Sequence, residues 1–465
     1  MANKQTEVSK KVNVGLLGLG TVGGGVYKTI ISNQETIRMR TGHEVEVSRI
    51  LVRDLEKERQ FDVDSRLLTL RAEDILQDES ITVLLEVMGG IEPARTIITA
   101  GLQSGRHVIT ANKELMAKHG AELLAIAEEH GVHLLFEASV AGGIPVIRML
   151  QGYLTANRVS EISGILNGTC NYILTEMAKT GREYADILAD AIELGYAESD
   201  PTSDVEGFDA AYKLAILTNL AYEAHVPVEA IERQGISHLH AADLRCADRF
   251  GCAIKLIGAA RQAQDGVTLS VRPRLLPKEH PLARIDDVFN AVTIQANVVG
   301  ELTFSGRGAG EFPTASAVLE DLTVLLTGSN AIRRPTWKHP LSVTAPAPAP
   351  NGGLYVSFNC PSNTLQADAV MIAEAYAAAV HRSGGRIVQH ALEESAGGIL
   401  RQAWLIAGVG EDAVQKTLDT LAASDAHALS AVILPVDGLS TLGVEWEADQ
   451  GWYEENASTV QAQAL

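Results

Sequence analysis

The sequence lacks the features of several common protein classes. Its 465 residues include four cysteines, and none of these form a Cys-x-x-Cys pair, so neither a disulfide framework nor a cysteine-based zinc site is predicted. No apolar run approaches the roughly 20 residues that cross a bilayer. The polar N-terminus also lacks the apolar centre of a signal peptide. We expect no membrane association and a cytoplasmic location.

Positive charge is scarce. Lys and Arg number 38 against 58 Asp and Glu, a net charge of −20. Phosphate backbones repel a chain this acidic unless its basic residues are gathered in one patch, and no such patch is visible. Nucleic acid is therefore not expected as a partner. The length predicts about three globular domains.

Short apolar segments alternate with helical patterns through the first 150 residues. This alternation predicts an α/β fold of the Rossmann type, with a doubly wound parallel sheet that binds ligands at the carboxyl ends of its strands. The expected strands cover 12–17, 45–52, 82–88, 107–111 and 133–138, and helices are expected between most of them, for example over 93–103 and 114–130.

The rest of the chain predicts two further units. The first is a second α+β domain, and the second has the βαββαβ order of a ferredoxin-like domain. The expected divisions are 11–150 for the dinucleotide-binding domain with a return helix at about 314–330, 151–313 for the second domain, 335–353 for a Pro-rich linker, 354–436 for the ferredoxin-like domain and 437–465 for an acidic tail.

A glycine-rich turn follows the first expected strand. Gly18, Gly20 and Gly23 form Gly-x-Gly-x-x-Gly before a helix. The first glycine allows a tight turn, the second lets backbone approach a pyrophosphate, and the third lets helix and strand pack closely. The helix start at Thr21 and Val22 offers N–H groups to phosphates. The motif predicts a dinucleotide site, with a purely structural turn as the alternative.

The residues after the second expected strand bear on the choice of dinucleotide. Arg53 and Lys57 favour the additional phosphate of NADP, whereas Asp54 is the type of residue that binds the ribose of NAD. We expect NADP or NAD, with NADP favoured. A solvated helix start of mixed charge is the alternative.

Two lysines lie where proton transfer is plausible. Lys113 follows the fourth expected strand, at the edge where doubly wound sheets bind ligands. Lys213 lies four residues after Asp209, which places both side chains on one helix face. A partly buried lysine held by a carboxylate is suited to donate or accept a proton. An ordinary intrahelical ion pair is the alternative.

The stretch 183–209 contains nine carboxylates and neither Lys nor Arg. Its later part is marked as a loop by Gly195, Pro201 and Gly207, and loops at sites concentrate function. Carboxylates such as Glu198 and Asp204 suit a cationic group, for example an α-amino group.

Two other strand-to-helix junctions are candidate sites. Asn167, Gly168 and Thr169 lie where free helical N–H groups are suited to bind an anion or a substrate. Cys170 is a conceivable nucleophile, but that role needs a nearby base or a lowered pKa, and a buried apolar thiol is favoured. Gly308, in the turn 305–318, would let backbone approach the cofactor.

Six segments of the chain, taken together and in their order along the sequence, resemble homoserine dehydrogenase of the bacterial three-domain type. The resemblance is strong over about 11–330 and loose beyond. It implies the reversible NAD(P)-dependent interconversion of L-homoserine and L-aspartate 4-semialdehyde, in threonine, methionine and isoleucine biosynthesis. The segments that carry it are GLGTVGGGV, TANKE, FEASVAGGIPVI, LNGTCNYIL, GYAESDPTSDVEGFDAAYKLAIL and GRGAGEFPTASAV.

The resemblance also implies roles for individual residues. Lys213 matches the proton-transferring lysine, Asp209 its supporting carboxylate and Lys113 the second lysine of the site. The matching substrate positions are Glu198, Asp204, Tyr196, Gly168 and Thr169, the cofactor positions include Lys113 and Gly308, and the ligands of a monovalent cation, sodium or potassium, are Glu137, Val140, Gly142 and Ile144.

The resemblance further implies that 151–313 is a substrate and dimerisation domain and that 354–436 is an ACT-like regulatory domain. This last domain departs from the family pattern. The Asp-x-Pro-Gly turn expected after its first strand is replaced by NCPSNTLQADA over 359–369. An amino-acid effector at this domain is therefore an open expectation. Family members commonly assemble, so a homodimer or homotetramer is expected.

Two other functions compete with this interpretation. One is a different dehydrogenase on the same scaffold, for example a semialdehyde dehydrogenase that uses Cys170 as a thiolate. The other is a non-catalytic dinucleotide sensor with an amino-acid-binding module. The carboxylates around Lys213 argue against a sensor, because a sensor needs no proton donor.

Overall fold

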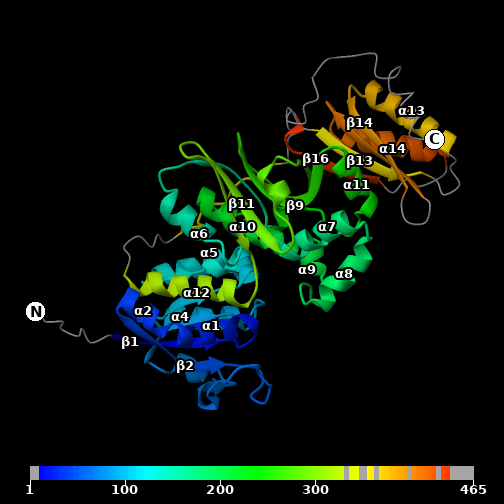
Figure 1. The fold of residues 1–465 in the computed structure, drawn as a ribbon. Helices are drawn as coiled ribbons and strands as arrows, with labels where there is room; N and C mark the ends of the chain where they lie inside the picture. The colour runs from blue at the N-terminus through cyan, green and yellow to red at the C-terminus, as the bar shows by residue number, and fades with distance from the viewer. Residues whose placement is uncertain are drawn as a thin grey trace, which may run out of the picture.

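The structure is a computed structural model, and its elements form three groups along the long axis of the molecule (Figure 1). Most of the expected tail at 437–465 and part of the expected linker at 335–353 lie outside the described residues. The described residues are 10–328, 335–344, 353–360, 366–394, 399–425 and 431–439.

The first group is a six-stranded sheet whose paired strands are all parallel. Its strand order, β3-β2-β1-β4-β5-β6, is the order of a dinucleotide-binding Rossmann fold and confirms the predicted architecture. The strands are β1 (Lys10–Leu17), β2 (His43–Leu51), β3 (Leu68–Thr69), β4 (Ile81–Glu86), β5 (His107–Thr110) and β6 (Leu134–Leu135), and the helices are α1 (Thr21–Ser32), α2 (Gln34–Thr41), η1 (Ser65–Leu67), α3 (Glu73–Leu76), α4 (Ala94–Gln103) and α5 (Lys113–Glu129).

A helix from far along the chain completes this group. Helix α12 (Glu311–Leu326) packs against α1, at the place expected for the return helix. The approach is close, because a Cβ on Gly25 would lie 2.7 Å from the Glu311 carbonyl oxygen and 3.2 Å from the Ala315 Cβ. Glycine at this position therefore lets α12 lie on the dinucleotide-binding sheet.

The second group is built on a sheet in the order β12-β11-β7-β9-β10, with β8 beside β10. The sequence analysis did not predict strand β9 or helix α11. Strand β9 is buried along most of its length, so it shows no apolar–polar alternation. The strands are β7 (Val159–Ile165), β8 (Glu232–Arg233), β9 (Cys252–Ala263), β10 (Gly266–Pro277), β11 (Phe289–Ala296) and β12 (Gly300–Arg307), and the helices are η2 (Glu137–Ser139), α6 (Val146–Arg148), η3 (Met149–Tyr153), α7 (Gly168–Thr180), α8 (Tyr184–Glu193), α9 (Thr202–Val205), α10 (Phe208–Tyr222), η4 (Val228–Ala230), α11 (Ala241–Arg249) and η5 (Pro281–Arg284).

The third group, which we name the C-terminal unit, has the expected βαββαβ order. Its strands lie in the order β16-β13-β15-β14, and neighbouring strands are antiparallel. Strand β16 also pairs with β10 in parallel, through Leu275 and Val436, so one sheet runs through the second group and the C-terminal unit. The elements are β13 (Gly353–Asn359), α13 (Gln366–Arg382), β14 (Arg386–Glu394), β15 (Leu400–Ala407), α14 (Glu411–Asp425) and β16 (Ala431–Val436).

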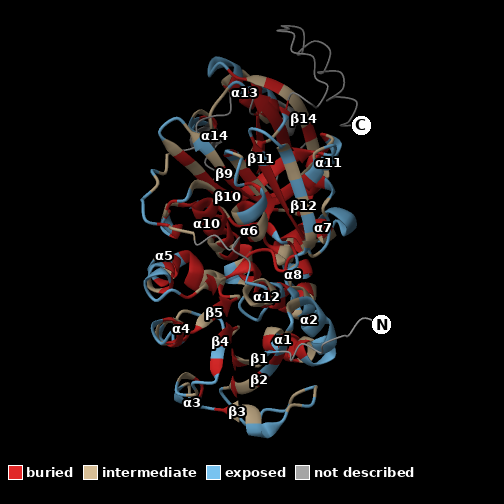
Figure 2. Ribbon diagram, turned by 90° about the vertical axis from the view of Figure 1, so that its left-hand side faces the viewer, coloured by how far each residue is buried: buried red, intermediate tan, exposed pale blue. Residues whose placement is uncertain are grey.

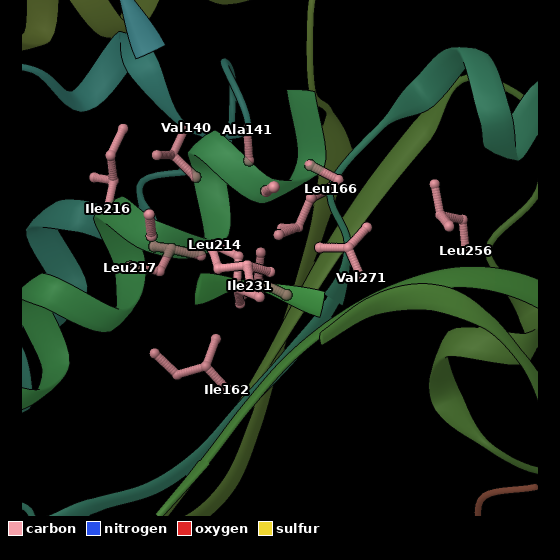
Figure 3. Packing of buried hydrophobic residues seen from close by; sticks show 14 of the residues in the cluster. Val140, Ala141, Ile162, Leu166, Leu214, Ile216, Leu217, Ile231, Leu256 and Val271 are labelled. Atoms are coloured by element: carbon pink, nitrogen blue, oxygen red, sulfur yellow. The ribbon is translucent and has the colours of Figure 1, made fainter. Parts of the chain in front are cut away.

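Buried residues follow the strands and the inner helix faces (Figure 2). The largest cluster surrounds α10, where Leu214 and Leu217 pack with Ile162 of β7 and with Leu166 (Figure 3). Helix α10 is thereby fixed in the centre of the molecule. Among the described residues, the chain contains no helix with the length and apolarity that a membrane crossing requires.

Candidate active site

The glycine-rich turn forms a cradle at the N-terminus of α1. Gly18 has a positive φ of 104°, and a Cβ on Gly23 would lie 2.2 Å from the Gly18 carbonyl oxygen. Around Gly20, by contrast, a Cβ would meet nothing within 4 Å. The helix start also carries no side-chain cap, so its first N–H groups are free for a phosphate. The turn therefore fits a dinucleotide pyrophosphate.

The end of β2 lies beside this cradle, because the Gly18 amide donates to the Leu51 carbonyl at 3.0 Å. Arg53 and Lys57 follow directly and are exposed. Within the described ranges, neither side chain forms a hydrogen bond or an ion pair. Two uncompensated cations are thus available next to the cradle.

The two predicted lysines meet at one buried carboxylate. Lys213 donates to Asp209 Oδ2 at 2.7 Å within α10, and Lys113, at the start of α5, forms an ion pair with Asp209 Oδ1. Asp209 is 2% exposed and Lys213 6%, whereas the Lys113 side chain is 44% exposed. Lys213 also donates to the Leu166 carbonyl at 2.7 Å. The site thus holds one deep ammonium group and one that borders solvent.

Burial and charge act differently on the three groups. Burial lowers the pKa of Lys213, and the attraction of Asp209 offsets this only in part. Attraction to Asp209 raises the pKa of Lys113. Burial tends to raise the pKa of Asp209, but the two ammonium groups outweigh it and hold that pKa well below its usual range. Of the two ammonium groups, Lys213 is therefore the one that gives up a proton more readily.

An asparagine links this cluster to the acidic loop. Asn167 Nδ2 donates to Asp204 Oδ1 at 2.7 Å and to Asp209 Oδ2 at 2.9 Å, while its Oδ1 accepts from the Cys170 amide and caps α7. Burial and the nearby Asp209 raise the pKa of Asp204. The sequence analysis did not assign Asn167 to the carboxylates. An asparagine at a strand-to-helix junction signals a cap, and only the tertiary fold reveals its second role.

The other predicted substrate residues surround the same cluster. Glu198 is exposed and contributes, with Asp209 and Asp204, to raising the pKa of Lys113. The Thr169 hydroxyl donates to the Tyr196 carbonyl at 2.7 Å, and the Tyr196 ring is 45% exposed. The structure therefore brings the predicted catalytic and substrate residues to one region between α5, α7, α9 and α10.

Two glycines enclose a buried amide beside this region. A Cβ on Gly308 would lie 2.1 to 2.4 Å from the side chain of Asn290, and one on Gly168 would lie 3.3 Å from Asn290 Oδ1. Asn290 Nδ2 donates to the Leu166 carbonyl at 3.0 Å, the same oxygen that Lys213 contacts. The sequence analysis also missed this residue, because no motif marks it at the start of β11.

Cys170 does not have the surroundings of a nucleophile. Its thiol is fully buried and donates to the Asp204 carbonyl at 3.2 Å. Burial raises the pKa of the thiol well above its ordinary value. These observations count against the thiolate alternative.

The expected cation segment contacts α12 and the end of β12, since the Glu137 amide donates to Asp321 at 2.8 Å and the Gly143 amide donates to the Arg307 carbonyl at 3.0 Å. Both carboxylate oxygens of Glu137 accept backbone N–H groups, from Ile147 at 3.0 Å and Arg148 at 2.8 Å. The buried carbonyls of Val140 and Gly142 accept no hydrogen bond from any described residue. A cation here would therefore be held mainly by carbonyl oxygens. Among the described residues, no group of three or more His, Cys, Asp or Glu side chains is arranged to hold a metal ion.

Comparison with known proteins decides the family. The protein-family model described as homoserine dehydrogenase matches residues 145–323. A second family model, described as the NAD-binding domain of homoserine dehydrogenase, matches residues 18–137. A homoserine dehydrogenase of Bacillus subtilis is 45% identical over 317 residues, which are 68% of this chain and 73% of that protein. The chain belongs to the homoserine dehydrogenase family. It is therefore an oxidoreductase with a nicotinamide-nucleotide-binding domain.

Solved structures of homoserine dehydrogenases agree with the fold. One from Thiobacillus denitrificans has a TM-score of 0.80 at 36% identity and covers 92% of this chain and 98% of that chain. A hyperthermophilic archaeal homoserine dehydrogenase in complex with NADPH has a TM-score of 0.59 at 27% identity and covers 70% of this chain and 100% of that one. The second match shows that a homoserine dehydrogenase with this architecture binds NADPH.

Proposed function

We propose that Lys213 is the proton carrier of this homoserine dehydrogenase, in the interconversion of L-homoserine and L-aspartate 4-semialdehyde. When bound, the nicotinamide supplies or accepts the hydride. In reduction, the Lys213 ammonium gives a proton to the aldehyde oxygen. In oxidation, the neutral amine takes the hydroxyl proton. The observation that carries this proposal is that Lys213 is nearly buried and bound to Asp209 at 2.7 Å, and that burial lowers the pKa of Lys213.

The neighbouring residues divide the remaining tasks. Asp209 orients Lys213 and balances the charge of Lys113, which borders solvent and is placed to meet the substrate or cofactor. Asp204 and Glu198 would hold the α-ammonium group of the substrate. Tyr196, Gly168 and Thr169 would shape the rest of the pocket.

For the cofactor we propose NADP over NAD. The pyrophosphate would lie on the cradle of Gly18, Gly20 and Gly23, at the first N–H groups of α1. Arg53 and Lys57 are exposed, carry no described partner and would pair with the 2′-phosphate. Gly308 would let backbone approach the nicotinamide end.

Three further proposals rest on the family resemblance. A sodium or potassium ion would be held by carbonyl oxygens of the segment from Glu137 to Ile144. The C-terminal unit would bind an amino-acid effector, and the chain would form a homodimer or homotetramer. We place the reaction in threonine, methionine and isoleucine biosynthesis.

The test compares two buried lysines. Lys213→Met is expected to lower kcat by about a thousandfold or more, the loss typical of a removed acid–base group. Lys255→Met is the matched control, because Lys255 is 3% exposed and is bound by Ile285 and Asp286 outside the site. Both variants are assayed by the absorbance of reduced nicotinamide, and their folding is checked by circular dichroism. A folded Lys213→Met variant with normal turnover would overturn the assignment.

A further inference from the structure

A segment between the acidic loop and the C-terminal unit touches both. We name residues 232–243 the linking segment; it includes β8, a turn and the first residues of α11. Helix α11 packs against β14 and β15 of the C-terminal unit (Figure 1). On its other side the linking segment meets α9, the four-residue helix that carries Asp204.

The contact with α9 is made by three consecutive residues. The Ile236 amide donates to the Val205 carbonyl at 2.9 Å, and the Ser237 hydroxyl donates to Glu206 Oε1 at 2.7 Å. A Cβ on Gly235 would lie 2.4 Å from the Val205 carbonyl oxygen and 2.6 Å from Glu206 Oε2. This approach is therefore possible only for glycine at 235.

The contact with the C-terminal unit centres on Asp243. This carboxylate is fully buried and is paired with Arg401 of β15, whose Nε lies 2.8 Å from Asp243 Oδ1. The Tyr355 hydroxyl of β13 donates to the same oxygen at 2.8 Å, and Ser357 donates there as well. Asp243 also accepts the His240 amide at 3.0 Å, so the network fixes the backbone where the linking segment enters α11.

A second connection joins the other end of the linking segment to the C-terminal unit. Arg272 of β10 donates to Glu411 at the start of α14 at 2.9 Å and lies 3.5 Å from Glu232. One end of the linking segment therefore contacts the C-terminal unit directly, through Asp243, and the other end is connected to it through Arg272. The middle of the segment contacts α9.

Helix α9 depends on such contacts for its position. A four-residue helix has almost no stability of its own, so its tertiary contacts decide where it lies. Asp204 is held from the active-site side by Asn167 at 2.7 Å. From the opposite side, the neighbouring Val205 and Glu206 are held by the linking segment.

We propose that the linking segment is a positioning element for Asp204 and that the C-terminal unit holds this segment in place through Asp243. The inference rests on the proposed role of Asp204 in binding the substrate ammonium. It makes the C-terminal unit a structural part of the substrate site even when that unit binds nothing.

The first experiment perturbs the contact with α9. Gly235→Ala is expected to raise KM for L-homoserine about tenfold, with a smaller change in kcat and an unchanged Kd for NADPH. Gly152→Ala is the control, since a Cβ there would meet nothing within 4 Å. A folded Gly235→Ala variant with a native KM overturns the positioning role.

The second experiment perturbs the contact with the C-terminal unit. Arg401→Met and the milder Tyr355→Phe, which removes only one hydroxyl donor, are expected to raise KM for L-homoserine severalfold. We also combine each of these two substitutions with Gly235→Ala. The increase in KM of each double variant is expected to be smaller than the product of the two single increases, because both substitutions act through the linking segment. Arg245→Met is the control, since Arg245 also contacts the C-terminal unit, at Glu393, but lies outside the linking segment.

The outcomes separate the two levels of the proposal. If Asp204→Asn leaves KM for L-homoserine unchanged, the proposed role of Asp204 is wrong. If Asp204→Asn raises this KM but folded Arg401→Met and Tyr355→Phe do not, the role of Asp204 stands and the role of the C-terminal unit is overturned.

Discussion

Removing the charge of Asp209 is the sharpest perturbation of the proposed proton carrier. Its Oδ2 lies 2.7 Å from Lys213 Nζ, and both side chains are nearly buried. Two unit charges about 4 Å apart at an effective dielectric constant near 20 attract by about 4 kcal/mol. Loss of this attraction lowers the pKa of Lys213 further, in the same direction as its burial. Solvent at the half-exposed Lys113 weakens the attraction, so we expect about 1.4 to 4 kcal/mol of it to be lost.

The direction of the effect follows from the protonation state that each reaction needs. Reduction of the semialdehyde requires Lys213 as ammonium, and Asp209→Asn lowers its pKa. The alkaline limb of kcat/KM against pH should therefore move to lower pH. At 1.36 kcal/mol per pH unit, the expected shift of this limb is about 1 to 3 pH units. The profile is measured by the consumption of reduced nicotinamide, with L-aspartate 4-semialdehyde as substrate.

A matched control and a stability measurement complete the experiment. Asp200→Asn changes an exposed carboxylate of the acidic loop, which among the described residues accepts a hydrogen bond only from Thr202. The pH profile of this variant should match that of the parent enzyme. Asp209→Asn also leaves Lys213 buried without its counter-ion, which should cost about 3 to 5 kcal/mol. A folded Asp209→Asn enzyme with an unshifted alkaline limb would refute the assignment of Lys213 as proton donor.

Three other predictions follow from the described contacts. Arg53→Ser should raise KM for NADPH about tenfold and leave that for NADH within about twofold, because only NADPH carries the phosphate; equal effects on both would contradict the pairing. Gly308→Ala should lower the free energy of unfolding by about 1 to 3 kcal/mol in denaturant titrations, because the methyl would lie 2.1 to 2.4 Å from Asn290. Replacing sodium and potassium by choline should reduce activity reversibly, and undiminished activity would remove the cation proposal.

Much of the first group could be predicted because its signals are local. Parallel strands buried on both faces appear as short apolar runs, and Gly18 and Gly23 mark the turn between the first strand and its helix. Strand β9 escaped prediction because it is buried along most of its length and contains small residues that do not suggest a strand. Helix α11 escaped as well, since its nine residues give a short and strongly charged pattern.

The site was predictable to the extent that its residues are neighbours in sequence. The spacing of Asp209 and Lys213 places them on one helix face, and the structure confirms this pair. The approach of Lys113 from another element, and the double contact of Asn167, depend on tertiary packing that no spacing reveals. Asp209 favours the ammonium form of Lys213, while burial acts in the opposite direction and lowers the pKa of Lys213.

The pairing of β16 with β10 has a consequence for shortened forms of the enzyme. Leu275 lies opposite Val436 in the paired strands, and the Leu275 carbonyl accepts the Asp437 amide at 3.0 Å. A chain that ends before β13 would lack β16. Part of β10 would then be exposed to solvent, with unpaired backbone groups and with apolar residues that are buried in the full chain. Such a fragment would be prone to self-association. The catalytic part of this chain therefore depends on the C-terminal unit to cover the edge of its sheet.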